Sequence, residues 1–151
     1  MVSPTQLATL VRATAAARDQ WQAVVRFTPR RRWFHRLALT DDYETWLLTW
    51  LPGQRTGFHD HGGASGAFAV AQGNLRETLA SPGSSRLRHR MARRGAVTSF
   101  GGQHVHEVGN ISHAPAVSVH AYSPPLTAMR RYELSGSGLT LVRTDRAEVD
   151  W

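Results

Sequence analysis

Two histidines separated by one residue, His59 and His61, are the first candidates for chemistry. They follow the turn-forming pair Pro52 and Gly53. Alternate residues of a strand point to the same face, so the two imidazoles would project together. Imidazoles at this spacing can bind one metal ion, and iron and zinc both accept them. A polar turn with two solvated histidines fits the same pattern, so the pair alone leaves both interpretations open.

Ser118, His120 and Tyr122 form a second group, at alternate positions of one predicted strand. Their side chains would share one face, where a hydrogen-bonded row is possible. The set looks like a nucleophilic triad, but no acidic residue accompanies it. A strand whose polar residues face solvent is the alternative interpretation.

The elements that would position these residues are short strands. Apolar and aromatic runs separated by turn residues recur from residue 33 onward, which predicts an all-β sandwich or barrel. The predicted strands are 33–39, 43–51, 67–71, 75–79, 86–90, 97–100, 104–108, 116–122, 129–134 and 139–143. Gln72, Gly73 and Asn74 indicate a hairpin turn.

The first 28 residues have a helical pattern instead. Ser3, Pro4 and Gln6 have the spacing of a helix start, and Asp19 could begin a second short helix. We expect one domain: residues 1–28 as helices packed outside, 29–143 as the barrel, and 144–151 as a polar tail.

Composition narrows the class of protein. The chain has 151 residues, 41% of them hydrophobic, and no cysteine. It can bury one core, which must supply the stability without disulfides. No apolar run approaches the roughly 18 residues that span a membrane, and no signal peptide is evident at the N-terminus. We therefore expect a cytoplasmic protein with no membrane partner.

The charge raises nucleic acid as a partner. Net charge is +7, and all 18 basic residues are arginine. They are scattered, and no basic helix or aromatic-interleaved basic sheet stands out. We therefore expect no nucleic-acid partner.

The spacing around the histidine pair resembles the first motif of the cupin family. Gly53, His59, His61 and Gly73 match the motif in order. The motif has a glutamate ligand where this chain has Gly66, so the carboxylate ligand is missing.

The second cupin motif ends in a histidine with asparagine four positions later, which His106 and Asn110 match. His104 is the competing ligand, because it would share a strand face with His106. We prefer His106 because of the asparagine spacing.

Taken together, these motifs resemble the bacterial thiol dioxygenases related to cysteine dioxygenase. The resemblance spans roughly residues 33–126, and its motifs lie at 52–53, 59–61, 72–75, 106–113 and 116–125. It implies a single-domain cupin barrel, jelly-roll-like, with short N-terminal helices. It also implies an enzyme that adds both atoms of O2 to the sulfur of L-cysteine. Dioxygenation of 3-mercaptopropionate or cysteamine, and a catalytically silent metal-binding or ligand-binding cupin, are the alternatives.

The resemblance assigns roles to named residues. His59, His61 and His106 would hold Fe(II). Tyr122 would bond the substrate carboxylate and the developing oxygen intermediate, aimed by Ser118 and His120.

The resemblance also implies an arginine that pairs with the substrate carboxylate, and Arg36 matches it. Its guanidinium fork suits a carboxylate, which favours L-cysteine. The segment before residue 45 is shorter than in the animal enzymes, so Arg32 and His35 remain alternatives. Phe34 stands where many relatives have tyrosine.

Other positions follow from the resemblance or from strand alternation. Animal members have a cysteine, crosslinked to the active-site tyrosine, where this chain has Gly66. The peptide bond between Ser123 and Pro124 would be cis. Asp60 would point away from the histidines into a structural hydrogen bond, and His89 and His113 would lie at the surface or in loops.

Overall fold

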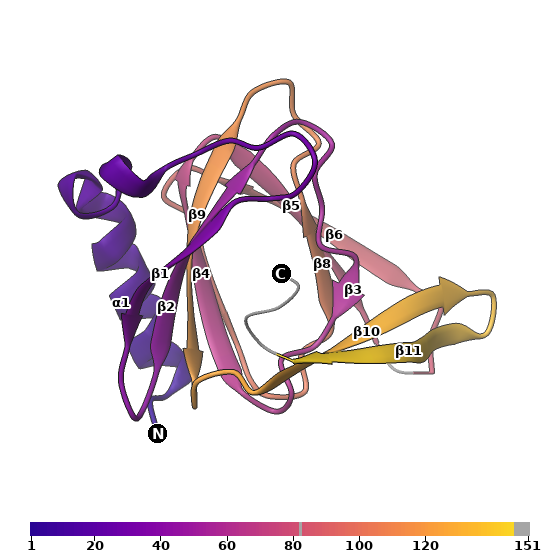
Figure 1. Ribbon diagram of the computed structural model, residues 1–151. Coiled ribbons are helices and arrows are strands. Elements are labelled where there is room, and N and C mark those ends of the chain that lie inside the picture. The colour runs from indigo at the N-terminus through magenta and orange to yellow at the C-terminus, as the bar shows by residue number, and fades with distance from the viewer. Residues whose placement is uncertain (82, 147–151) are drawn as a thin grey trace.

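A computed structural model describes residues 1–81 and 83–146 of the chain. In this part, two sheets face each other and form a barrel (Figure 1), as predicted. The first sheet has the order β1-β2-β9-β4-β7, and the second has the order β11-β10-β3-β8-β5-β6. In chain order the strands are β1 (Phe34–Leu39), β2 (Glu44–Trp50), β3 (Phe58–His59), β4 (Ser65–Gln72), β5 (Asn74–Ala80), β6 (Leu87–Arg93), β7 (Val97–Phe100), β8 (His106–Gly109), β9 (Ala116–Ser123), β10 (Ala128–Ser135) and β11 (Gly138–Arg146).

One α-helix, α1 (Pro4–Ala16), lies outside the barrel (Figure 1). Ser3 and Gln6 form the predicted capping box, in which the Ser3 hydroxyl accepts from the Gln6 amide and the Gln6 side chain accepts from the Ser3 amide. The expected second helix is replaced by two short 3-10 turns, η1 (Arg18–Gln20) and η2 (Gln22–Val24).

Successive side chains of β9 point alternately into two hydrophobic cores, one on each face of the strand. Val117, Val119 and Ala121 face outward and pack in one cluster with Leu7 and Val11 of α1. The residues between them face the barrel interior. Because both faces are covered, every residue of β9 is buried. The polar residues of β9 thus lie on the face opposite α1, toward the barrel interior.

The barrel interior holds the larger core. Trp50, Phe68, Leu75 and Val108 are completely or almost completely buried there, together with Met129. Each such side chain contributes about 1.5–3 kcal/mol through burial. Val108 and Met129 of this core also line the cavity described below.

Several element boundaries differ from the sequence-based expectation. β11 continues through Arg146, so residues 144–146 of the expected tail belong to a hairpin with β10; residues 147–151 lie outside the described part. β8 begins at His106, which leaves His104 in the preceding turn. The peptide bond between Ser123 and Pro124 is cis, as expected.

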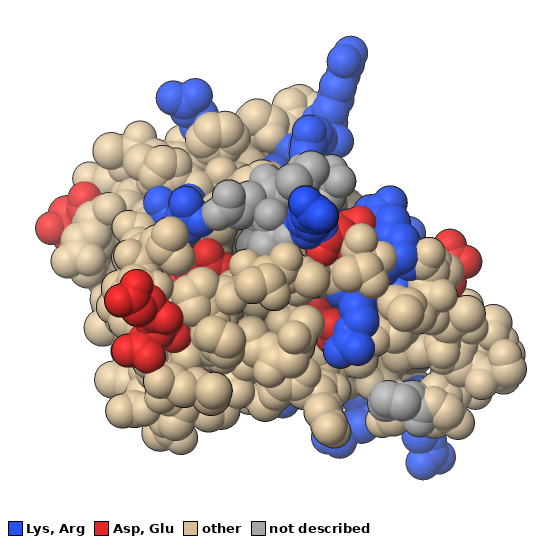
Figure 2. Space-filling view, turned by 60° about the horizontal axis from the view of Figure 1, so that its bottom comes forward, with Lys and Arg blue, Asp and Glu red and all other residues tan. Residues whose placement is uncertain are grey.

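The surface carries dispersed charge. On the face shown in Figure 2, arginine side chains project at several separate places, with acidic residues between them. No helix in the described residues combines the length and apolar character needed to cross a membrane.

Candidate metal centre and adjoining cavity

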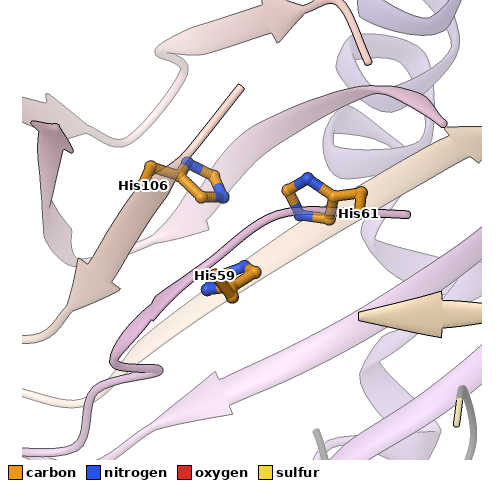
Figure 3. Close-up of side chains that lie close together, drawn as sticks. All are labelled: His59, His61 and His106. Carbon is orange, nitrogen blue, oxygen red and sulfur yellow. The ribbon is translucent and has the colours of Figure 1, made fainter. Parts of the chain in front are cut away.

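Three histidines converge inside the barrel (Figure 3). His59 on β3 is paired directly across the sheet with His106 on β8, and His61 follows two residues after His59. All three are buried, and one ring nitrogen from each lies within 4.8 Å of the others. The strand pairing thus brings together the three residues predicted as ligands.

The hydrogen bonds of the rings leave one nitrogen of each available to a metal. The Nδ1 atom of His59 lies 2.9 Å from the Gly57 carbonyl, and the Nδ1 atom of His106 lies 2.8 Å from Glu77 Oε1. Both nitrogens therefore carry a proton, and the Nε2 atoms are bare. The Nε2 atom of His61 is buried without a partner among the described residues. A buried polar atom without a partner is costly, so this geometry fits a bound cation.

Burial also keeps these rings in the form that binds metal. It lowers the pKa of His59 and of His61 well below the usual histidine value, and the neighbouring histidines add to this effect. Burial lowers the pKa of His106 as well, although the Glu77 carboxylate opposes that shift. Neutral imidazole is the ligand form, so the site is prepared for a divalent ion near neutral pH.

His104 occupies a different position from the three ligands. Its Nε2 atom lies 3.0 Å from Glu77 Oε1, the same oxygen that accepts from His106. These contacts have hydrogen-bond lengths, so His104, Glu77 and His106 form a hydrogen-bonded group. The geometry therefore favours His106 over His104 as the third ligand.

The polar row on β9 faces this centre. The Ser118 hydroxyl lies 2.8 Å from His120 Nε2, and the Tyr122 hydroxyl lies 3.3 Å from His120 Nδ1. All three residues are buried, so the solvent-facing alternative does not apply. Trp50 extends the row, because its indole N–H donates to the Ser118 hydroxyl at 2.8 Å.

The Trp50 indole can only donate, so the Ser118 hydroxyl accepts from it and keeps its own hydrogen for another partner, such as His120 Nε2. When Ser118 donates to Nε2, His120 carries its proton on Nδ1, facing Tyr122. Burial lowers the pKa of His120 to about 3, which keeps the ring neutral. Burial raises the pKa of Tyr122, so its hydroxyl stays protonated.

A small cavity joins the histidines to the row. Its lining includes His59, His106, His120 and Tyr122, and two cationic side chains, Arg32 and Arg131. The Arg131 guanidinium contacts Asp145 and the Thr56 carbonyl. The cavity is therefore lined by two of the candidate metal ligands, by the tyrosine hydroxyl and by two positively charged guanidinium groups.

Arg32 is one of the two cationic residues that line this cavity. Its guanidinium stacks over the Trp50 ring at 4.8 Å, and its Nη1 atom is buried without a hydrogen-bond partner in the described part of the chain. Burial, and then the charge of Arg131, lower the pKa of Arg32 to about 10, so it remains charged near neutral pH. A half-buried guanidinium with one buried nitrogen in this state would be stabilised by an anion beside it.

Arg36, the residue matched by motif, lies elsewhere. Its guanidinium is 5.3 Å from the Trp46 ring and 3.9 Å from the Glu44 carboxylate, and Arg36 is not among the residues that line the cavity. His35 is exposed on the other face of β1. The geometry therefore favours Arg32, one of the alternatives, over Arg36.

Gly66 adjoins Tyr122 across β4 and β9. A Cβ atom there would lie 2.5 Å from the Phe100 ring and 3.0 Å from the Tyr122 ring. In this chain the Phe100 ring therefore fills the space that a side chain at position 66 would need. The Phe100 ring also stacks on the His61 ring, with 4.9 Å between the ring centroids. The Tyr122 ring stacks on His61 as well, at the same centroid distance of 4.9 Å.

Gly66→Ala is expected to destabilise the protein by about 1–3 kcal/mol, the usual cost of overpacking a core. Urea unfolding measures the change. Gly101→Ala is the matched control, since a Cβ there meets nothing within 4 Å. Equal stability of the two variants would show that Phe100 yields without cost.

Other sequence-based expectations concern single residues. Asp60 points away from the metal centre, as expected, and accepts from Arg130, the Tyr132 hydroxyl and the Gly62 amide. His89 and His113 are exposed.

Sequence reasoning did not identify Glu77, Trp50 or Arg131. Glu77 carried a usable signal, because strand alternation places it on the same face as Leu75, an inward position where a carboxylate is unusual.

The fold and the three-histidine centre define a cupin, a double-stranded β-helix with a candidate metal site. The chain resembles an uncharacterized protein with a double-stranded β-helix domain from Klebsiella pneumoniae, with a TM-score of 0.59 and 17% identity over 81% of this chain and 93% of that one. It also resembles a cupin superfamily protein from Desulfitobacterium hafniense, with a TM-score of 0.57 and 10% identity over 69% and 87% of the two chains.

Sequence relatives specify the family. Residues 2–135 match the family model of cysteine dioxygenase type I, so the chain belongs to that family. It is 33% identical over 96 residues to cysteine dioxygenase type 1 of Danio rerio, and 32% identical over 98 residues to that of Homo sapiens. Each match covers 58% of this chain and 48% of the relative, so the chain spans about half the length of these curated relatives.

Proposed function

We propose that the protein is an Fe(II)-dependent thiol dioxygenase that adds both atoms of O2 to the sulfur of L-cysteine, giving cysteine sulfinic acid. The observation that carries this proposal is the arrangement of one cavity. Two of the three converging histidines, His59 and His106, line it together with a protonated tyrosine and the half-buried Arg32, and His61 completes the histidine group beside it. Family membership supports the same reaction type.

His59, His61 and His106 would hold the iron. Iron, when bound, would supply a centre at which a thiolate and O2 meet. The three ligands are neutral, so the charge of the ion is not cancelled by them, and a substrate thiol near it would lose its proton readily. Phe68 and Phe100 line the core around the rings and exclude water.

Arg32 would select the substrate by its carboxylate. A guanidinium binds a carboxylate through two parallel hydrogen bonds, and the buried Nη1 atom of Arg32 lacks a partner in the described residues. This supports L-cysteine, with 3-mercaptopropionate as the nearest alternative. It disfavours cysteamine, which has no carboxylate and carries an ammonium group.

Tyr122 would donate a hydrogen bond to the substrate carboxylate or to oxygen charge that develops in the reaction. The row from Trp50 through Ser118 and His120 orients that hydroxyl. Its protonated state follows from burial, which raises its pKa. The row positions a donor; no residue of it acts as a nucleophile in this proposal.

Oxygen uptake by the iron-loaded protein tests the proposal. We expect consumption with L-cysteine, less with 3-mercaptopropionate and least with cysteamine, and cysteine sulfinic acid as the product. A protein that binds iron but consumes no oxygen with any of the three thiols would be a silent metal-binding cupin.

Tyr122→Phe is expected to lower turnover by about 10- to 100-fold, because it removes one hydrogen bond to a charged group, worth about 1.5–3 kcal/mol. Iron content should not change, since Tyr122 is not a ligand. Oxygen electrode rates and iron analysis of the same samples measure both. Tyr43→Phe, on the connection between β1 and β2, is the control. Unchanged turnover in Tyr122→Phe would remove its assigned role.

A further inference from the structure

Glu77 connects the metal centre to the wall of the barrel. It lies on β5 and is only 1% exposed. Its Oε1 atom accepts from His106 Nδ1 at 2.8 Å and from His104 Nε2 at 3.0 Å, and its Oε2 atom accepts from Arg90 Nε at 2.7 Å. Three donors therefore hold one carboxylate in place.

The register of the sheet explains this arrangement. Glu77 stands directly opposite Arg90 on β6, and His106 is opposite Leu79, two residues along β5. Glu77 and His106 are thus diagonal neighbours with inward side chains, within reach of long residues. No ligand is needed for this contact, because the pairing of β5 with β8 creates it.

We propose that Glu77 is a positioning residue for the metal centre, which fixes the orientation of the His106 ring and strengthens it as a ligand. The proposal rests on the metal role of His106 in the proposed function. A carboxylate that accepts from the far nitrogen of a metal-binding imidazole fixes the tautomer and raises the electron density of the ligand. His104 and Arg90 would in turn hold the carboxylate.

The negative charge of Glu77 would also increase the affinity of the site for a metal cation. The cavity wall contains the cations Arg32 and Arg131, and the three ligands are neutral. Asp60 lies between two ligands in sequence, but its carboxylate is engaged outward by Arg130 and Tyr132. Glu77 therefore places a negative charge behind the ligand set, and its removal would weaken binding of any divalent cation.

Metal affinity of the full chain tests the proposal without reference to turnover. Metal-free protein is titrated with Co(II) and with Fe(II) against a competing chelator, and the visible absorption of the Co(II) form is recorded. Glu77→Gln, which keeps an acceptor but removes the charge, is expected to weaken binding by about 10- to 100-fold and to change the Co(II) spectrum.

Two further variants keep this test decisive. Glu107→Gln removes a carboxylate beside His106 on the same strand and should change affinity by less than about 2-fold. If Glu77→Gln does not fold, Glu77→Asp keeps the charge opposite Arg90 but withdraws it from His106, and it should also weaken binding. Unchanged affinity and spectrum in the folded Glu77 variant would overturn the proposal, whereas an unaltered protein that binds neither ion would overturn the metal site itself.

Discussion

His106→Ala is expected to abolish both iron binding and oxygen uptake. The substitution removes one of three ligands that converge in a buried site. The loss of affinity should exceed about 100-fold, because even the residues that support metal ligands contribute 10- to 100-fold. Iron analysis after desalting and oxygen uptake with L-cysteine measure the two effects. Circular dichroism establishes that the variant is folded.

His104→Ala is the matched control for this prediction. The two histidines are two positions apart, but His104 contacts the Glu77 carboxylate and has no place among the three ligands. It should keep its iron, with an affinity lowered by less than about 10-fold through the loss of one contact to Glu77. If His104→Ala loses iron and His106→Ala retains it, the assignment of the third ligand is reversed.

Arg32→Gln is expected to reduce kcat/KM for L-cysteine by about 30- to 1000-fold. Truncation of one partner of a buried, hydrogen-bonded charge pair costs about 2–4 kcal/mol. Most of the loss should fall on KM if the carboxylate is held equally in the ground state and the transition state. Steady-state oxygen uptake with L-cysteine and 3-mercaptopropionate measures it.

Two comparisons separate this role from a general loss of structure. Cysteamine lacks the carboxylate, so its low rate should be unchanged or increased in Arg32→Gln. Arg36→Gln removes a charge four residues away on β1, next to Glu44 and outside the cavity lining, and should leave KM within about 3-fold. A larger effect from Arg36 than from Arg32 would restore the assignment made from the motif.

The two arginines differ in their relation to the cavity, and the motif position does not predict this difference. Both precede or lie on β1, and both stack on tryptophans of the neighbouring strand, Arg32 on Trp50 and Arg36 on Trp46. Arg32 lines the cavity and Arg36 does not, although residues four apart would share one face of a continuous strand. Arg32 precedes β1, so its position depends on how the segment before that strand lies against Trp50 of β2, which sequence spacing does not contain.

The positions of the histidines could be predicted from the sequence, because they depend on short spacing along the chain or on motifs. His59 and His61 are close along the chain, so a short spacing was enough to bring their rings together, although β3 ends at His59. The row on β9 follows from strict alternation along one strand. His106 required the resemblance to a family, because its approach to His59 depends on the pairing of β3 with β8.

The sequence by itself determined the class of fold, the three candidate ligands and the polar row, since each depends on a period of two residues or on ordered motifs. Only the tertiary structure decided that Arg32 rather than Arg36 lines the cavity and that Glu77 accepts a hydrogen bond from His106. It also placed His104 beside Glu77 and outside the group formed by His59, His61 and His106. These choices depend on contacts between strands far apart in the chain, where a shift of one residue turns a side chain to the opposite face.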